Sequence, residues 1–240
     1  EYSRRASDPA PLALKNFYIA YRAVVRAKVD CVRVAQGHKE AAADARRHID
    51  IALKHLRAGT VQLIIVGGGP GTGKTTLSRA LAEQLGAQVI STDDVRRELQ
   101  RAGVIAGTGG VLGAGLYTPE NICTVYDEVV RRAHLLLSSG TSVILDGTWR
   151  GARQRERARE LADQTSSPIV ELTCSVPIEK ASARIQSRRV TTSDATPQIA
   201  AELAEHADVS TDGHLIDTSR SLADSVNEAE QICRSHNADN

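Results

Sequence analysis

The 240-residue chain contains no methionine and few aromatic residues. Phe, Trp and Tyr together make up 3% of it, with a single Phe and a single Trp. Because the chain begins at Glu1 and lacks Met altogether, we expect that an upstream segment of the protein has been removed. The scarcity of aromatic rings also disfavours a surface that binds nucleic acid by base stacking.

Cysteine pairs and long hydrophobic runs are missing too. The four cysteines lie far apart without a CxxC pair, and the seven histidines show no zinc-ligand spacing. We therefore expect free thiols in a reducing, cytoplasmic compartment. No apolar run approaches the ~18 residues of a membrane span, and the N-terminus has no signal-peptide core. The net charge of +1 and the sequence pI of about 8.0 favour neither a membrane nor a polyanion as partner.

The stretch Gly68–Thr75, GGPGTGKT, matches the phosphate-binding P-loop pattern GxxxxGK[ST]. An apolar, β-branched run over Thr60–Val66 precedes it and predicts a buried strand. Residues Lys74–Leu85 follow with helical periodicity, and Gly86 ends that helix. Strand, glycine-rich turn and helix in this order are the context that the motif requires.

A P-loop binds phosphate mainly through its backbone. The glycines let N–H groups approach phosphate oxygens closely, and the helix N-terminus adds the positive end of its dipole. We expect Lys74 to reach the β- and γ-phosphates of ATP and the Thr75 hydroxyl to bind Mg²⁺. The expected ATP-binding residues are Gly69, Gly71, Thr72, Gly73, Lys74, Thr75 and Thr76.

Beyond the P-loop, short apolar runs alternate with helical patterns. Strands are expected at 60–66, 87–90, 142–145, 168–174 and 214–216. This alternation predicts an α/β domain over residues 60–240, with a parallel sheet covered by helices on both faces. Ligands should then gather at the carboxyl ends of the strands. The glycine-rich stretch 103–115 is expected to be a mobile loop that either covers a substrate or only connects its neighbours.

Residues 1–59 have a different character. Helical spacing of apolar residues predicts two helices, Leu12–Gln36 and His38–Ala58. They carry so much aromatic and aliphatic surface that they need a partner. We interpret residues 1–59 as the helical tail of a truncated upstream domain; the alternative is an α-hairpin that packs on the P-loop domain.

Missing motifs narrow the class of reaction. Asp146 closes an apolar strand, as the Mg²⁺-side acid of a P-loop protein should, but Gly147 follows where hydrolytic ATPases often carry a glutamate. The chain also contains neither the NKxD signature of GTPases nor the LSGGQ signature of ABC transporters. These absences favour a P-loop protein that transfers phosphate to an acceptor other than water.

Charged residues near the strand ends are candidates for this transfer. Asp93, with Arg96 one turn later, can take the proton of an acceptor hydroxyl; the alternative is a helix N-cap. Arg184 and Arg188 share one helix face and can neutralise charge on the transferring phosphoryl group as part of a mobile lid, or else form a solvated surface. Arg150 begins an arginine-rich helix, and we expect it to meet an anionic substrate or phosphate.

The pattern from Val61 to about Thr218 resembles the small-molecule and nucleic-acid P-loop kinases related to polynucleotide 5′-kinase and the zeta-toxin kinases. The resemblance implies a five-stranded sheet in the order 2-3-1-4-5. It implies that Lys74 is the P-loop lysine, that Asp93 is the acceptor-side general base and that Arg96 is its neighbouring arginine.

Two shorter segments extend this resemblance. Asp146–Arg150, DGTWR, resembles the acid-Gly-Thr-x-Arg substrate segment of the zeta-type kinases. Arg184 and Arg188 fall at the positions of the lid arginines. These motifs do not carry over the identity of the acceptor.

The N-terminal part is similar to another family. Asn16–Lys28, NFYIAYRAVVRAK, looks like the closing helices of an aminoglycoside-phosphotransferase-like domain. In the fused family, such a domain precedes a P-loop kinase domain. The resemblance implies that the partner of this chain is an upstream phosphotransferase-like domain of the same protein, whose catalytic residues would precede Glu1.

Together these features predict an ATP- and Mg²⁺-dependent kinase that phosphorylates a hydroxyl of a small-molecule acceptor. The first alternative is a polynucleotide 5′-hydroxyl kinase, with the arginine-rich helix as its phosphate track; near-neutral charge and few aromatic residues disfavour it. The second is a non-catalytic ATP-binding regulatory module that senses nucleotide for the upstream domain. Because a P-loop alone indicates binding, this alternative stays open.

Overall fold

The computed structural model describes residues 11–109, 113–187 and 213–239. They form two compact units. One unit contains the N-terminal helices together with residues 139–141. The other contains the described residues of 62–138, 142–187 and 213–239, and it carries the P-loop.

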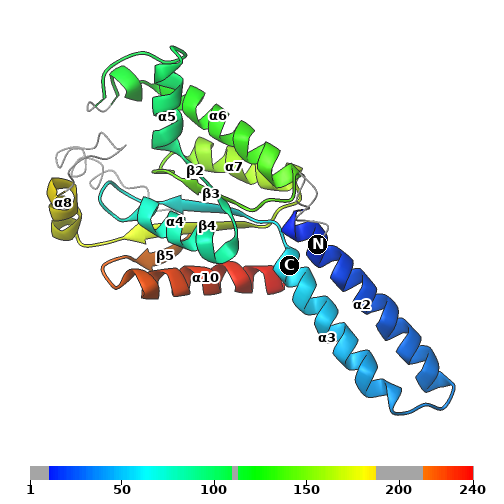
Figure 1. Ribbon diagram of the computed structural model, residues 1–240. Coiled ribbons are helices and arrows are strands. Elements are labelled where there is room, and N and C mark those ends of the chain that lie inside the picture. The colour runs from blue at the N-terminus through cyan, green and yellow to red at the C-terminus, as the bar shows by residue number, and fades with distance from the viewer. Residues whose placement is uncertain (1–10, 110–112, 188–212, 240) are drawn as a thin grey trace, which may run out of the picture. The chain divides into compact units, whose positions relative to one another are not determined.

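The larger unit is built on a five-stranded parallel sheet (Figure 1). Its strands are β1 (Leu63–Gly67), β2 (Gln88–Ser91), β3 (Val143–Asp146), β4 (Ile169–Ser175) and β5 (His214–Asp217). They lie in the order β2-β3-β1-β4-β5, with every neighbouring pair parallel. The predicted α/β class and strand order are confirmed.

Helices cover both faces of this sheet, as Figure 1 shows. Those that follow the strands are α4 (Lys74–Leu85), α5 (Thr92–Arg101), α6 (Pro119–Ser138), α7 (Ala152–Gln164), α8 (Ile178–Ser187) and α10 (Leu222–Asp239), with a short 3₁₀ turn η1 (Gly115–Tyr117) before α6. Helices α4 and α10 cover one face, and α6 and α7 cover the other.

The central strands carry the core. The side chains of β1 and β3 are all buried. On the face covered by α4 and α10, Ile64, Ile144 and Leu172 pack with Leu77 and Leu81 of α4. Continuous β-branched and aliphatic runs suit strands that are buried on both faces, which is why the sequence pattern located them.

Element boundaries differ from the sequence predictions by one to three residues. Strands β2, β3 and β4 each begin and end one residue later than predicted, and the second N-terminal helix begins three residues later. These shifts bring Ser91 and Asp146 into the strands themselves. A helix predicted from about Pro197 to His206 lies outside the described residues.

The smaller unit is a hairpin of two helices, α2 (Leu12–Ala35) and α3 (Ala41–Gly59). Small residues fill its seam: Ala20, Ala23 and Ala52 form the buried cluster. Two polar pairs cross the same seam, His48 Nδ1 with Asp30 Oδ2 and His55 Nδ1 with Asn16 Oδ1, each at 2.8 Å.

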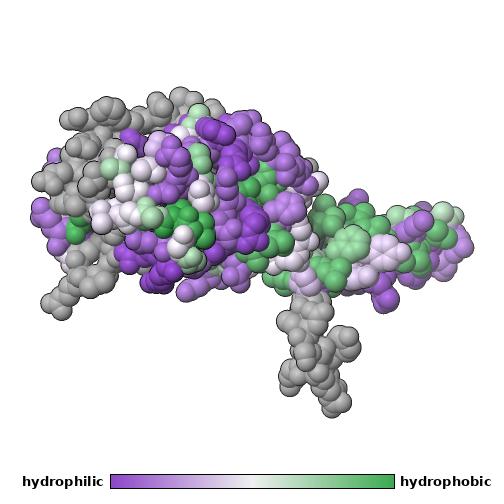
Figure 2. Space-filling model, turned by 90° about the horizontal axis from the view of Figure 1, so that it is seen from above, coloured by the Kyte–Doolittle hydropathy of each residue, from purple (hydrophilic) through white to green (hydrophobic). Residues whose placement is uncertain are grey.

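Bulky apolar residues of the hairpin lie on its outside. Large side chains with 42–59% of their surface exposed are Leu12, Leu14, Phe17, Tyr18, Tyr21, Val24, Val25, Val29, Val32, Ile49, Leu53 and Leu56. Figure 2 shows hydrophobic colour over much of the visible surface of this hairpin. Among the described helices, none is long and apolar enough to cross a membrane.

Candidate nucleotide and acceptor site

The register of the sheet brings the predicted site residues to one edge. Val66 pairs with Asp146 across β1 and β3, and Ser91 pairs with the same Asp146 across β2 and β3. The P-loop leaves β1 directly after this level, and α5 leaves β2. Ser91 and Asp146, which are 55 positions apart in the sequence, therefore meet at the carboxyl edge of the sheet.

The P-loop is closely packed against the rest of the domain. Gly71 has a φ of +78°, and a Cβ placed there would lie 2.5 Å from the carbonyl oxygen of Ala181 in α8. Only glycine fits such a position. The Thr72 hydroxyl donates to the Gly69 carbonyl at 2.8 Å, which holds the loop in an arched conformation.

Lys74 and Thr75 follow the loop at the start of α4. The Lys74 ammonium donates to the Gly69 carbonyl at 2.7 Å, so it lies folded over the loop where phosphate oxygens would bind. The Thr75 hydroxyl donates to Asp146 Oδ2 at 2.7 Å. Both side chains thus lie beside the loop, at the N-terminal end of α4.

Asp146 is a buried acid, with 2% of its surface exposed. Burial raises the pKa of its carboxyl; the Thr75 hydroxyl and the charge of Lys74 oppose this shift, and the charge of Asp93 adds to it. A hydroxyl and a carboxylate in contact are hard oxygen donors that suit Mg²⁺. Within the described ranges, this site included, no group of three or more His, Cys, Asp or Glu side chains could hold a metal ion.

Asp93 and Arg96 form an ion pair at the same edge. Arg96 donates to Asp93 Oδ1 at 2.6 Å and lies over the Tyr117 ring, 4.5 Å from its centroid. The Arg96 side chain is 7% exposed, whereas that of Asp93 is 32% exposed. The N-cap of α5 is Ser91, so Asp93 lies within the first turn and is not the cap. A fixed guanidinium thus holds a carboxylate that solvent still reaches.

The turn after Asp146 is strained. Trp149 has a φ of +49°, a conformation that bulky residues rarely adopt. Its indole N–H donates to the Leu145 carbonyl at 3.1 Å, and its ring meets Tyr126 edge to face at 4.9 Å. Burial raises the pKa of Tyr126, while a hydrogen bond with Thr148 lowers it. The contacts of the indole with Leu145 and Tyr126 therefore hold the turn in this conformation.

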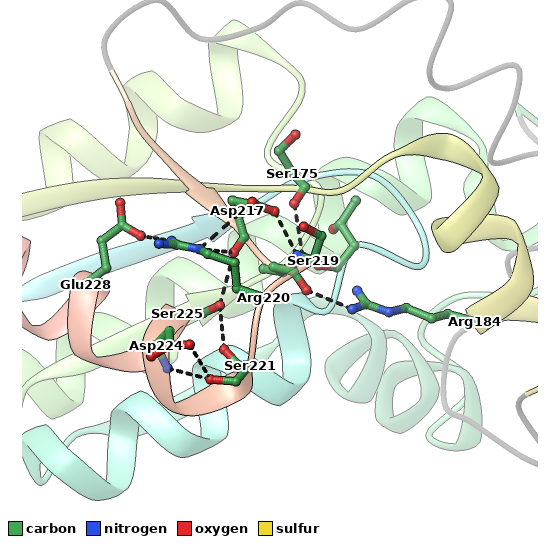
Figure 3. A network of polar contacts seen from close by, with 11 residues as sticks. Ser175, Arg184, Asp217, Ser219, Arg220, Ser221, Asp224, Ser225 and Glu228 are labelled. Atoms are coloured by element: carbon green, nitrogen blue, oxygen red, sulfur yellow. Dashed lines mark hydrogen bonds and ion pairs between the residues drawn. The ribbon is translucent and has the colours of Figure 1, made fainter.

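Helix α8 contacts the loop through Arg184. Its guanidinium donates to the Thr218 carbonyl at 2.7 Å and to the Gly71 carbonyl at 3.5 Å. Thr218 in turn donates to the Thr72 carbonyl at 2.6 Å. Figure 3 shows Arg184 pointing from α8 toward the turn between β5 and α10, where Ser219 and Arg220 lie.

Comparison with known proteins identifies the family. A family model described as AAA domain matches residues 63–223. The chain belongs to this family. It is also 56% identical, over 98% of its length, to proteins from Mycobacterium tuberculosis and Mycobacterium bovis that are described as uncharacterized. The chain spans about half the length of these relatives, 47% of each.

Solved structures share the fold of this AAA domain. A gluconokinase from Sinorhizobium meliloti 1021 has a TM-score of 0.54 at 17% identity, covering 74% of this chain and 94% of that one. A sugar kinase from Janibacter sp. HTCC2649 has 0.54 at 18%, covering 73% and 98%. The APS kinase CysC of Mycobacterium tuberculosis, in complex with AMPPNP and APS, has 0.54 at 16%, covering 72% and 97%. The AAA domain therefore has the fold of P-loop kinases.

The remaining predicted arginines have different surroundings. Arg150 is half-buried directly after Trp149, before α7 begins. In α7 itself, Arg157 pairs with Asp127 of α6 and Arg159 pairs with Glu171 of β4 at 2.7 Å. Two of the arginines of α7 are thus anchored to neighbouring elements by ion pairs within the AAA domain. Arg188 lies outside the described residues.

Sequence reasoning did not single out Tyr117, Tyr126 or Trp149. A signal was available, because these are the only aromatic residues between positions 60 and 240. In the structure, Tyr117 lies against Arg96, the charges of Arg96 and Asp93 affect the pKa of Tyr126, and Trp149 packs on Tyr126. Thr218 was also overlooked as a contact of the P-loop, and no local pattern distinguishes it from other threonines.

Proposed function

We propose that the AAA domain is an ATP- and Mg²⁺-dependent kinase that transfers the γ-phosphoryl group to a hydroxyl of a small-molecule acceptor. One observation carries this proposal: the accessible carboxylate of Asp93 lies at the same sheet edge as Lys74 and the Thr75–Asp146 pair. The influence of Asp93 on the pKa of Asp146 reflects their proximity. Hydrolytic ATPases often carry their second acid directly after the Mg²⁺-side acid, where this chain has Gly147, whereas Asp93 comes from the end of another strand.

Each residue has a role in this reaction. The P-loop amides and Lys74 hold the β- and γ-phosphates, with Lys74 exchanging the Gly69 carbonyl for phosphate oxygens. Thr75 and Asp146 would hold Mg²⁺, which would supply positive charge beside the phosphates. The acceptor oxygen forms a bond to the γ-phosphorus, the bond from that phosphorus to the bridging oxygen of ADP breaks, and Asp93 takes the hydroxyl proton. Arg184, on α8, and Arg150 are the candidates to stabilise the transferring group and the acceptor.

The ion pairs of α7 favour a small acceptor over a polynucleotide. A phosphate track needs arginines directed at the nucleic acid, and here Arg157 and Arg159 pair with Asp127 and Glu171. The net charge of +1 also gives little long-range attraction for a polyanion. We therefore place the 5′-hydroxyl of a polynucleotide second.

For the remainder of the chain, we propose that residues 1–59 are the helical tail of an upstream phosphotransferase-like domain and that residues 60–240 form the kinase domain. The exposed apolar residues of α2 and α3 support this division, since exposed patches of this kind mark interaction surfaces. The greater length of the relatives is consistent with it.

Phosphate transfer from labelled ATP to a panel of hydroxyl metabolites, aminoglycosides and 5′-hydroxyl oligonucleotides tests the function. We expect a small molecule to be labelled, and Lys74→Ala to abolish the labelling. Preferential labelling of oligonucleotides would support the polynucleotide alternative. Tight ATP binding without any labelled acceptor would instead favour the regulatory module.

A further inference from the structure

A cavity of about 420 Å³ lies against α5, beyond Asp93. Arg97, Gln100 and Arg101 of α5 line one side of it, and Gly107, Thr108 and Leu116 from the following loop and η1 line the other. We call it the arginine cavity. Among its described lining residues there is no carboxylate.

The loop that closes this cavity has a defined conformation in its described part. Gln100 donates from Nε2 to the Gly107 carbonyl at 3.1 Å, tying the loop to α5. At Gly107 φ is +127°, and a Cβ there would lie 2.5 Å from backbone carbon of Gly115. Asn121 of α6 donates to the Ala106 and Gly115 carbonyls at 3.1 and 2.8 Å. The wall is therefore built by specific contacts.

The arginine cavity continues the helix stripe that begins at Asp93. Arg97 and Arg101 follow Asp93 at i+4 and i+8, so the three side chains leave α5 within one sector of the helix. A rise of 1.5 Å per residue puts the Cα atoms of the two arginines about 6 and 12 Å along the axis from the Cα atom of Asp93. A compound of small-metabolite size can span this distance.

The charges around the cavity favour an anion. Of the three carboxylates of α5, Asp93 pairs with Arg96 and Glu98 pairs with Arg132 of α6, each at 2.6 Å, and Asp94 lies one turn before Arg97. None of the three is among the described residues that line the cavity. Arg97 is half-buried and Arg101 is exposed. Guanidinium groups offer paired donors that match carboxylate, phosphate and sulfate oxygens.

We propose that the arginine cavity binds an anionic group of the phosphate acceptor, a carboxylate, phosphate or sulfate, while Asp93 receives the proton of the acceptor hydroxyl. This inference rests on the proposed kinase function and defines its substrate class. The acceptor is then a hydroxylated anion of small-metabolite size.

Matched pairs of anionic and neutral hydroxyl compounds test the proposal. We would measure transfer from ATP to D-gluconate and D-glucitol, and to glycerol 3-phosphate and glycerol. We expect the anionic member of a pair to be phosphorylated in preference. In the double variant Arg97→Gln/Arg101→Gln, its KM should rise roughly tenfold or more, while the KM for ATP is unchanged. Arg79→Gln, an exposed substitution on α4, is the matched control.

The outcomes separate this site from the kinase function. Equal transfer to both members of each pair, or an unchanged KM in the double variant, would overturn the anion site and leave the kinase proposal standing. If no compound is phosphorylated, anion binding to the cavity can still be tested without catalysis. D-gluconate and D-glucitol would be titrated calorimetrically into the chain saturated with AMPPNP and Mg²⁺. Binding of gluconate alone, lost in the double variant, would support the site; equal or absent binding of both would refute it.

Discussion

At the level of single residues, Asp93 combines a fixed position with access to solvent. Arg96 holds one of its carboxylate oxygens at 2.6 Å, yet about a third of the side chain, 32%, stays exposed. Arg96 itself is buried, and its Nε has no hydrogen-bond partner within the described structure. Such an arrangement costs stability, which is the expected signature of a carboxylate positioned for chemistry.

Replacing Asp93 by Asn tests the proposed base. Asn retains an oxygen that accepts from Arg96 but cannot take a proton at neutral pH, so kcat should fall by about 10²-fold or more. ATP affinity, measured by calorimetry, should stay the same, and the unfolding free energy should fall by about 1–2 kcal/mol. Asp94→Asn is the neighbouring control and should have a much smaller effect. Transfer at the wild-type rate in the Asp93 variant would exclude the base role.

The buried carboxylate of Asp146 should lower the stability of the folded chain and at the same time support cation binding. Burial raises its pKa in the folded chain, so the folded state binds the proton more tightly than the unfolded state, and stability falls as pH rises through the folded pKa. Asp146→Asn removes this penalty. At neutral pH we expect a Tm higher by roughly 2–4 °C, corresponding to about 1 kcal/mol for a domain of this size.

The same variant should lose the effect of Mg²⁺ on nucleotide affinity, roughly 10–100-fold. The Tm difference from wild type should shrink at acidic pH, where Asp146 is protonated in both states. Thermal scans across pH, and ATP titrations with and without Mg²⁺, measure both effects. A variant that is less stable at neutral pH and still responds to Mg²⁺ would contradict the role assigned to Asp146.

At the level of elements, the sequence predicted the parts whose signals are local. The P-loop has its own motif, and β1 and β3 are aliphatic runs buried on both faces. Because strands of one parallel sheet end at a common edge, the meeting of Thr75 with Asp146 also followed from the pattern. The left-handed conformation of Trp149 did not, since only the surrounding packing makes it tolerable.

The arginine cavity could not be predicted from the sequence either. The glycines of 103–115 predicted a loop without indicating its shape, and contacts such as that of Asn121 with the Ala106 carbonyl hold its described part. The ion pairs between α7 and its neighbours join residues that are far apart in the sequence. Arg157 and Asp127, for example, are 30 residues apart. Pairings of this kind appear only once the elements are packed.

Helix α8 should respond to nucleotide. Arg184 donates to the Thr218 and Gly71 carbonyls, contacts that a nucleotide phosphate can replace with a charge-assisted one. We expect hydrogen exchange of residues 178–187 to slow when AMPPNP and Mg²⁺ bind, together with that of the P-loop. Arg184→Ala should lower kcat by about 10³-fold or more and leave the far-UV spectrum unchanged. Protection of the P-loop without any change in α8 would mean that Arg184 is only a structural contact.

At the level of the whole molecule, the two units differ in how well they bury their apolar residues. The AAA domain encloses its aliphatic side chains between sheet and helices. The hairpin has an alanine seam, with its bulky residues turned outward. Alanines allow two helices to approach closely and contribute little buried area, so the larger side chains provide most of the surface that another partner could bury.

The outward face of α2 should therefore govern association more than nucleotide binding. Phe17, Tyr21 and Val25 follow one another at i, i+4 and i+8, and they are 54%, 57% and 42% exposed. Replacing all three by Ser should reduce light scattering and dye binding by the 240-residue chain, because a contiguous exposed apolar stripe promotes association. Helix content should stay nearly the same, since the seam residues Ala20 and Ala23 remain. ATP affinity should not change if residues 60–240 form the kinase domain by themselves; a marked loss would show instead that the hairpin contributes to the nucleotide site, which is the alternative of an α-hairpin packed on the P-loop domain.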